Sequence, residues 1–368
     1  MKILLLKTNL VEGLGIVERA VNESSNLPIL KNVLLRAEGG KIILITTNLE
    51  LAVEYSMSGK VLEEGGVALP FSLFCSIIRN LAAERISIEE KEGKVIITTD
   101  NYEAVLQGQD PKEFPIIPSV HKEAQRFVCG VESFRGALAS VIVAAQYSDI
   151  RPEISGVYFE YSGGDAVFAA TDGFRLAEKK LESGSIKTDA EKISVIIPLK
   201  TASELLKVFK EQHEITIFVE SNQILLSAPN EKITSRLIDG SFPDYRAVIP
   251  KNTPHEAIIE RQEFINAVRL ASSFSGRAND ITLKSGDNKK FLEVYATDSA
   301  LGESSYKVPA KLSGEKFSVV FNWRYLLDGL KVFSGTDITL GIHSSERPAL
   351  LRNPKEPHLI YVVMPIKG

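Results

Sequence analysis

The chain repeats one pattern of strand and turn three times. An apolar strand runs into Thr-Asn or Thr-Asp in "ILITTNLEL", "FAATDGFRL" and "VYATDSALG". The three Asx residues, Asn48, Asp172 and Asp298, lie 124 and 126 residues apart. Self-similarity at a fixed period indicates that each copy is one structural unit. The 368 residues therefore predict three related domains in place of a single large core.

A second set of markers keeps the same register. "VALPFSLFCSIIRNL", "VIIPLKTASELLKVF" and "VVFNWRYLLDGLKVF" each read as a strand, then Pro70, Pro198 or Asn322, then an amphipathic helix. An earlier helix precedes each set, and alternating strands such as "KIILITT" and "EITIFVE" fill the rest. We predict an α+β fold of three tandem repeats, in which two helices pack on an antiparallel sheet.

The joints between the repeats are polar and marked by proline. They fall around residues 119–125 and 249–256. We therefore predict domains at residues 1–119, 126–250 and 251–368.

Composition argues against a membrane protein. No stretch approaches the roughly 18 apolar residues of a spanning helix, and 44% of the residues are hydrophobic. Cys75 and Cys129 are the only cysteines and form no paired framework, which is typical of a reducing compartment. We expect a cytoplasmic protein with two buried thiols.

The sequence carries no motif of catalysis. The five histidines are dispersed, and no phosphate-binding loop or nucleophile elbow is present. A hydrolase that uses Asp172 with Arg175 is one alternative. Because Asn48 replaces the aspartate in the first copy, we interpret Asp172 as a turn residue, since Asn and Asp both hydrogen-bond their own backbone. We predict no catalytic residue, no metal and no cofactor.

Cations recur at one offset in the second helix of each repeat. Arg79, Lys207 and Lys331 each lie nine residues past the marker, and Lys200 and Arg324 lie two residues past it. Such charges are often only a solvated face. If the helices share one concave side, these cations would contact a phosphate backbone without reading its sequence.

The chain resembles the bacterial DNA polymerase III beta subunit family, the DNA sliding clamps. The resemblance rests on "LPILKNVLL", "ATDGFRLA", "DGSFPDYRAVIP", "FNWRYLLDGL" and "YVVMPIK", and it runs from Met1 to Lys367. It implies a head-to-tail homodimer that closes into a ring around duplex DNA. The ring would tether the DNA polymerase III catalytic subunit, and a clamp loader complex that uses ATP would open it.

The resemblance also implies a groove that binds short peptides of that polymerase, of other polymerases and of repair proteins. Phe174 and Ala247 depart from the residues common in the family and make the groove less polar. The groove residues carried over are Ile154, Thr171, Gly173, Phe174, Arg175, Leu176, Pro243, Val248, Val362, Met364, Pro365 and Ile366.

Charge asymmetry favours head-to-tail pairing of two chains. Residues 1–119 carry a net charge of −4, and residues 251–368 carry +3. For the apolar contacts of the dimer interface we predict Tyr102 and Leu106 in the first domain, with Leu270 and Phe274 in the third. The alternative to a clamp is a repeat scaffold that binds proteins without encircling DNA.

Overall fold

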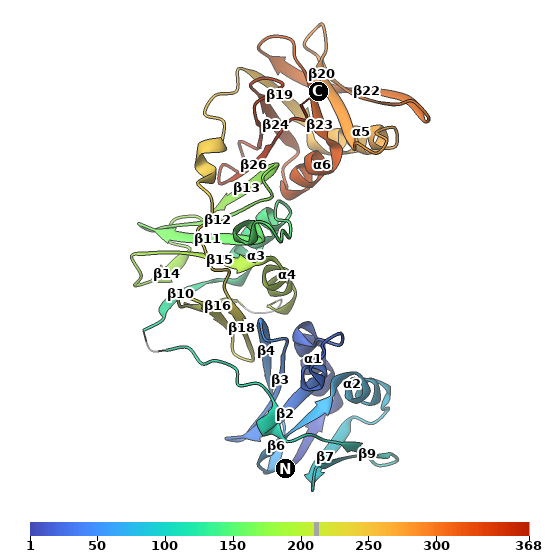
Figure 1. Ribbon diagram of the computed structural model, residues 1–368, viewed down its shortest axis with the longest axis vertical. Helices are drawn as coiled ribbons and strands as arrows, with labels where there is room; N and C mark the ends of the chain where they lie inside the picture. Colours follow the sequence, from blue (N-terminus) through green and yellow to red (C-terminus); the bar gives the residue numbers. More distant parts are fainter. Residues whose placement is uncertain (122, 210–212, 368) are drawn as a thin grey trace. The chain divides into compact units, whose positions relative to one another are not determined.

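The computed structural model describes residues 1–121, 123–209 and 213–367, and it divides into two compact units (Figure 1). Unit 1 comprises Met1–Val131, Lys187–Ala190 and Glu204–Leu237. Unit 2 comprises Glu132–Ile186, Glu191–Ser203 and Ile238–Gly368. Positions 122, 210–212 and 368, some of which fall inside the predicted domains, lie outside the described residues.

Unit 1 contains two antiparallel sheets. The five-stranded sheet has the order β5 (Lys60–Glu63), β1 (Lys2–Leu6), β7 (Arg85–Lys91), β8 (Lys94–Thr98) and β9 (Glu103–Gln107). The nine-stranded sheet has the order β14 (Ile186–Thr188), β10 (Gln125–Gly130), β16 (Glu214–Val219), β17 (Gln223–Ser227), β18 (Glu231–Arg236), β4 (Leu51–Met57), β3 (Lys41–Thr47), β2 (Asn32–Glu38) and β6 (Gly65–Pro70).

Helices cover the apolar side of these sheets. In α1 (Lys7–Val17) the side chains of Leu10, Leu14 and Val17 are fully buried, and the helix packs against β3, β4 and α2 (Phe71–Asn80). Burying such a side chain stabilises the fold by about 1.5–3 kcal/mol. The short helices of this unit are η1 (Glu18–Ala20), η2 (Pro28–Lys31) and η3 (Pro111–Glu113).

Unit 2 is built on one twelve-stranded sheet. Its order is β15 (Lys192–Pro198), β11 (Gly156–Ser162), β12 (Asp165–Thr171), β13 (Arg175–Lys180), β26 (Leu359–Val363), β25 (Ala349–Arg352), β24 (Asp337–Ile342), β19 (His255–Glu260), β22 (Gly302–Ser313), β21 (Phe291–Asp298), β20 (Asp280–Ser285) and β23 (Ser318–Asn322). Its helices are α3 (Val131–Ile142), η4 (Pro152–Ile154), η5 (Tyr245–Val248), α5 (Arg261–Ser272) and α6 (Trp323–Val332), and the division between the units falls within α4 (Leu199–Val208).

Within each unit, a sheet runs across a boundary between sequence repeats. In unit 1, β18 of the second repeat pairs antiparallel with β4 of the first, with Ser235 opposite Leu51. In unit 2, β26 of the third repeat pairs with β13 of the second, with Val363 opposite Arg175. The last strand of one repeat therefore always joins the strand that follows the Thr-Asx turn of the repeat before it.

The structure confirms that the Thr-Asx segments are turns. The Oδ1 atom of Asn48 accepts from the backbone N–H groups of Glu50 and Leu51 at 3.0 and 2.8 Å. Asp298 accepts in the same way from two N–H groups, at 2.9 and 3.1 Å. An amide and a carboxylate accept the same hydrogen bonds in this turn, because only an acceptor oxygen is needed.

The second markers begin helices as predicted. Pro70, Pro198 and Asn322 are the last residues of β6, β15 and β23, and α2, α4 and α6 start at the next residue. At Asn322 the side chain accepts from the N–H of Arg324 at 2.9 Å, which is the N-cap bond expected of asparagine. The predicted fold of strand and helix in three copies is therefore confirmed.

Candidate functional site

The turn between β12 and β13 forms the centre of the candidate groove in unit 2. Asp172 Oδ1 accepts from the N–H groups of Phe174 and Arg175 at 2.9 and 3.0 Å. The Oγ1 of Thr171 donates to the carbonyl of Arg175 at 2.6 Å. Gly173 has φ +89°, a conformation that costs glycine little. The turn holds the Phe174 side chain outward, with 61% of it exposed.

Arg175 is the electrostatic anchor of this turn. Its guanidinium pairs with Asp172 at 2.9 Å and with Asp328 at 2.6 Å, and only 11% of its side chain is exposed. Burial would lower the pKa of Arg175, but the carboxylates of Asp328 and Asp172 raise it above its ordinary value. For the Tyr361 hydroxyl, burial has the opposite effect and raises the pKa, so this side chain stays a neutral phenol. The carboxylate of Asp172 is thus occupied by structural contacts and is not a free base.

The chain end forms one wall beside the turn. After β26, the N–H of Met364 donates to the carbonyl of Phe174 at 2.8 Å. The N–H of Ile366 donates to the carbonyl of Val320 at 2.8 Å. Met364 and Ile366 are half-buried and Pro365 is buried, so backbone bonds hold this tail while part of each flanking side chain reaches solvent.

Residues 242–249 pack on the apolar cluster beneath the turn. Buried Leu176, Tyr245 and Val362 belong to one apolar cluster, and Phe242 and Ile249 pack against it. Tyr245 donates to Glu178 at 2.6 Å. Pro243 is half-buried and Val248 is 50% exposed, so this segment offers apolar surface above a buried floor.

Ile154 enters the site from a different direction. It is buried at the end of η4. Near it, a Cβ atom placed on Gly173 would lie 3.8 Å from Nη1 of Arg151. The structure therefore brings the segments of all predicted groove residues together within unit 2, and their role in peptide binding stays a prediction.

Two residues of α6 that sequence reasoning did not identify also contact the turn. The Tyr325 ring lies 6.5 Å from the Phe174 ring, stacked at 21°, and Asp328 pairs with Arg175. Both belong to the segment "FNWRYLLDGL", which we had interpreted only as a DNA-facing helix. The conspicuous aromatic and acidic residues of that helix were the available signal.

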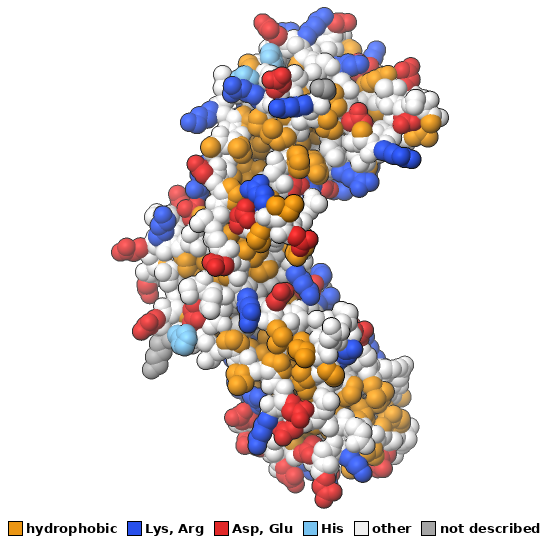
Figure 2. All heavy atoms as spheres, in the orientation of Figure 1, with side chains coloured by type: hydrophobic (Ala, Val, Ile, Leu, Met, Phe, Trp, Pro, Cys, Tyr) orange, Lys and Arg blue, Asp and Glu red, His pale blue; other side chains and the backbone are white. Residues whose placement is uncertain are grey.

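The predicted DNA-facing cations differ in their partners. Arg79 pairs with Glu18 at 2.9 Å, and Lys207 pairs with Glu204 at 2.8 Å. The exposed side chains of Lys200 and Lys331 have no ion pair among the described residues. Arg324 lies 5.2 Å over the Trp323 ring. Figure 2 shows Lys and Arg interspersed with Asp and Glu on the visible face of each unit. DNA contact by these five cations stays a prediction.

The predicted dimer residues differ in how far their side chains reach solvent, and their role in an interface stays a prediction. Leu106 lies on the edge strand β9, but its side chain is only 4% exposed and packs into the core of its own sheet. Side chains alternate along a strand, so the neighbour Val105 points outward and is 54% exposed. Tyr102 is 39% exposed and Leu270 is 54% exposed, whereas Phe274 is half-buried.

Within the described ranges, no group of three or more His, Cys, Asp or Glu side chains could hold a metal ion. Among the same residues, no helix is long and apolar enough to cross a membrane.

Three family models match the chain in succession. They describe the N-terminal, central and C-terminal domains of the DNA polymerase III beta subunit, and they match residues 1–118, 130–244 and 246–367. These ranges cover nearly the whole chain.

Similar proteins agree with the family models. A beta sliding clamp of Synechococcus elongatus is 28% identical over 100% of this chain and 99% of its own, and one of Staphylococcus epidermidis is 27% identical over 95% and 94%. The solved sliding clamp of Bacillus subtilis has a TM-score of 0.94 and 26% identity, and it covers 100% of this chain and 99% of its own. The DNA polymerase III subunit beta of Pseudomonas aeruginosa has a TM-score of 0.95 and 25% identity over all of both chains.

Proposed function

We propose a mechanism for this chain from the premise that it belongs to the DNA polymerase III beta subunit family and is a DNA sliding clamp and processivity factor. Two copies close head to tail into a ring around duplex DNA. The clamp performs no chemistry itself and acts in the cytoplasm, where it keeps the polymerase on its template. We keep residues 1–119, 126–250 and 251–368 as its three domains.

One observation carries the proposal of a closed ring. At both junctions inside the chain, the last strand of a repeat pairs with the strand after the preceding Thr-Asx turn. Two strands lack such a partner among the described residues. Residues 302–309 of β22 pair only with β21, and β9 pairs only with β8. A second copy supplies each missing strand, and this is how a head-to-tail ring closes without a free sheet edge.

The register of this third junction follows from the other two. Gly302 lies opposite Asp298 in the β21–β22 ladder. It is the position of the third repeat that corresponds to Leu51 in the first repeat and to Arg175 in the second. On β9, Leu106 corresponds to Ser235, because the residues two positions further on form equivalent backbone hydrogen bonds. The N–H of Gly108 donates to the carbonyl of Gly93, as the N–H of Leu237 donates to the carbonyl of Asn222. We therefore pair residues 302–305 of one copy antiparallel with residues 103–106 of the other.

The groove beside the Thr171–Leu176 turn is the docking site for partners. We assign it short apolar peptides of the replicative polymerase, of other polymerases and repair proteins, and of the clamp loader. Exposed Phe174 and Val248 above a buried floor support this assignment, because an extended peptide can bury its own apolar side chains there. Arg175 is fully engaged by carboxylates, so selectivity comes from shape more than from charge.

The proposal of a DNA-encircling clamp is tested by topology. Protein loaded on nicked circular DNA by a clamp loader should stay bound during gel filtration, and cutting the circle should release it. Negative-stain images should show closed rings at the same protein concentration. Equal retention on circular and linear DNA would mean that the protein binds DNA without encircling it.

A further inference from the structure

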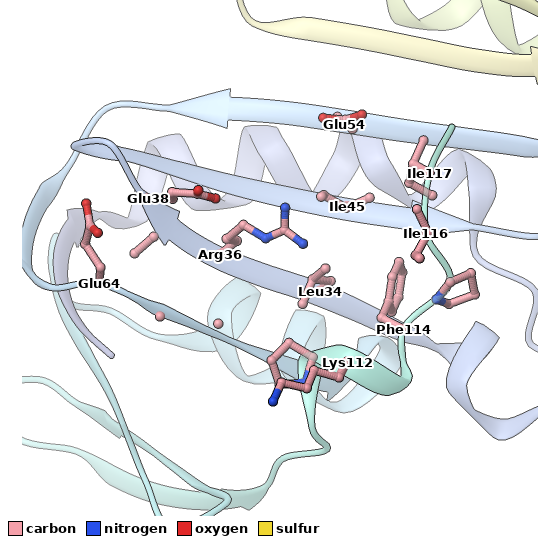
Figure 3. A pocket seen from close by; sticks show the side chains of 15 residues that line it. Leu34, Arg36, Glu38, Ile45, Glu54, Glu64, Lys112, Phe114, Ile116 and Ile117 are labelled. Atoms are coloured by element: carbon pink, nitrogen blue, oxygen red, sulfur yellow. The ribbon is translucent and has the colours of Figure 1, made fainter. Parts of the chain in front are cut away.

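A hollow of about 760 Å³ lies in unit 1, where residues 111–117 cross one face of the nine-stranded sheet (Figure 3). Its size is within the range of about 300–1,000 Å³ that is typical of binding pockets. It is separate from the groove, which lies wholly in unit 2. Its labelled lining residues are Leu34, Arg36, Glu38, Ile45, Glu54, Glu64, Lys112, Phe114, Ile116 and Ile117.

One end of the hollow has a preformed apolar floor. Leu34, Ile45 and Phe114 are buried in one cluster, and Ile117 packs against it. Ile116 follows in the same crossing segment, and 93% of its side chain is exposed. The floor is covered by these contacts, so at this end of the hollow Ile116 offers apolar surface that a partner can still cover.

Arg36 lies in the middle of the hollow without a partner. It is half-buried on β2, and no hydrogen bond or ion pair to it forms among the described residues. Its cross-strand neighbours are Ile43 on one side and Gly66 on the other. Gly66 lines the hollow without a side chain of its own. A half-buried charge without a partner is costly, and a carboxylate would remove that cost.

The second repeat shows the same position with its charge satisfied. Glu160 pairs with Val167 across the strands, as Arg36 pairs with Ile43, at an offset of 124 residues. There the crossing segment supplies Arg246, which forms an ion pair with Glu160. In the first repeat Pro118 stands 128 residues before Arg246, and a proline offers no charge.

The aromatic contact of the crossing segment is kept in both repeats. Phe242 stacks on Tyr158 at 4.8 Å in the second, and Phe114 packs with Leu34 in the first. The two copies thus share one architecture, and they differ in whether the charge on the strand is neutralised from within the chain.

We propose that this hollow binds an extended peptide segment of a partner protein, with an apolar, an acidic and a basic side chain at alternating positions. On β2, Leu34, Arg36 and Glu38 lie on one face of the sheet at intervals of two, roughly 6.6 Å apart, and Leu34 is already covered by the crossing segment. An extended peptide presents its own side chains at the same interval. Its apolar side chain packs on the exposed Ile116, its carboxylate binds Arg36, and its cation faces Glu38 and Glu64. This site goes beyond the clamp function and does not require the groove.

A labelled peptide of the pattern Leu-Thr-Glu-Thr-Lys, flanked by serines and blocked at both ends, tests the site with the full chain. We expect saturable binding in fluorescence polarisation. Arg36→Glu should weaken it by about tenfold or more, since a hydrogen-bonded charge pair is lost. Gly66→Leu should also block it by filling the hollow, because a Cβ atom there meets its nearest neighbour at 3.4 Å and the backbone is ordinary. Circular dichroism checks that both variants fold.

The controls make each outcome decisive. Arg85→Glu, the same charge change at an exposed position on β7, should leave binding unchanged, and so should Met364→Ala in the groove. A peptide with Glu and Lys exchanged should prefer the Arg36→Glu variant to the wild type. The proposal is overturned if the peptide shows no saturable binding, or if Arg85→Glu weakens binding as much as Arg36→Glu does. It is also overturned if the wild type binds the exchanged peptide as tightly as the original peptide, or if Met364→Ala weakens binding.

Discussion

The guanidinium carbon of Arg175 lies 4.5 Å from the centre of the Tyr325 ring, so a residue of the second repeat is stacked on a helix of the third. The contact is a cation–π pair, reinforced by the ion pair of Arg175 with Asp328. It fixes the turn that carries Phe174 against the helix that carries Tyr325. The turn and α6 are therefore held together by contacts within the chain itself.

Met364→Ala should lower the affinity of a polymerase-derived clamp-binding peptide by about tenfold or more. The side chain supplies apolar contact, while the backbone bond from Met364 N–H to Phe174 remains. Fluorescence polarisation measures the change, with Ile258→Ala as the matched control, an exposed apolar residue on β19. Affinity equal to that of the control would remove Met364 from the site.

Asp172→Asn should lower the free energy of unfolding by about 1–3 kcal/mol, the range for a hydrogen bond to a charged group. The amide keeps the turn bonds but loses the charge that faces buried Arg175. The reciprocal change Asn48→Asp should have little effect, because no arginine stands there. Urea denaturation of both variants measures the difference. Equal destabilisation would show that the turn, and not the ion pair, accounts for the loss.

Val105→Asp should produce a folded monomer, because it places an unpaired charge on β9, the edge strand that we propose to pair with β22 of a second copy. Leu62→Asp is the control, on β5 at the other edge of the same sheet, where the side chain is 44% exposed. Sedimentation velocity at micromolar concentration should find the wild type and Leu62→Asp dimeric. A dimeric Val105→Asp variant would place the interface elsewhere.

Alanine at Lys200, Arg324 and Lys331 should weaken retention on DNA equally for all sequences and flatten its log-log salt dependence. Each lost phosphate contact reduces the slope by at most about 0.9. Alanine at Arg79 and Lys207 should change it less, because Glu18 and Glu204 already neutralise these two cations. Retention on circular DNA across a salt series measures both variants. A larger effect of the second pair would reverse this ranking.

Cys129 should resist alkylation in the folded protein at pH 8. Burial raises the pKa of this thiol to about 12 from an ordinary value of 9.0, so almost no thiolate forms. Burial also raises the pKa of Cys75. The unfolded chain ionises first as the pH rises, so this contribution to stability is present below pH 9 and declines above it. Mass spectrometry after iodoacetamide should find no label until denaturant is added, and rapid native labelling would contradict the burial.

Sequence repetition predicted the elements of the fold because local signals set them. Pro70, Pro198 and Asn322 mark helix starts through properties of single residues. The direction of Leu106 depended on which face of β9 is buried, and a short strand with apolar residues at both Val105 and Leu106 does not reveal this.

Residues of the candidate groove were predictable where they lie close together along the chain or match a sequence pattern of the family. Tyr325 and Asp328 escaped because their contacts with Phe174 and Arg175 span about 150 residues of chain and depend on how strands pair. Arg36 escaped for another reason. Arg36 has no ion-pair partner among the described residues, and this becomes visible only when the neighbouring side chains are placed.

The repeated turn divides its residues into those that hold the backbone and those that are free to change. In the copies around Asn48 and Asp172, the Asx oxygen accepts from backbone N–H groups, and the hydroxyls of Thr47 and Thr171 each donate to the carbonyl three positions past the Asx residue. The intervening positions are Leu49 and Glu50 in one copy, and Gly173 and Phe174 in the other. The first of these two positions has a left-handed backbone, at Leu49 and at Gly173, and the second is left to vary. Repetition thus supplies several copies of one backbone frame, and the copy that holds Phe174 at the second position presents an exposed aromatic side chain.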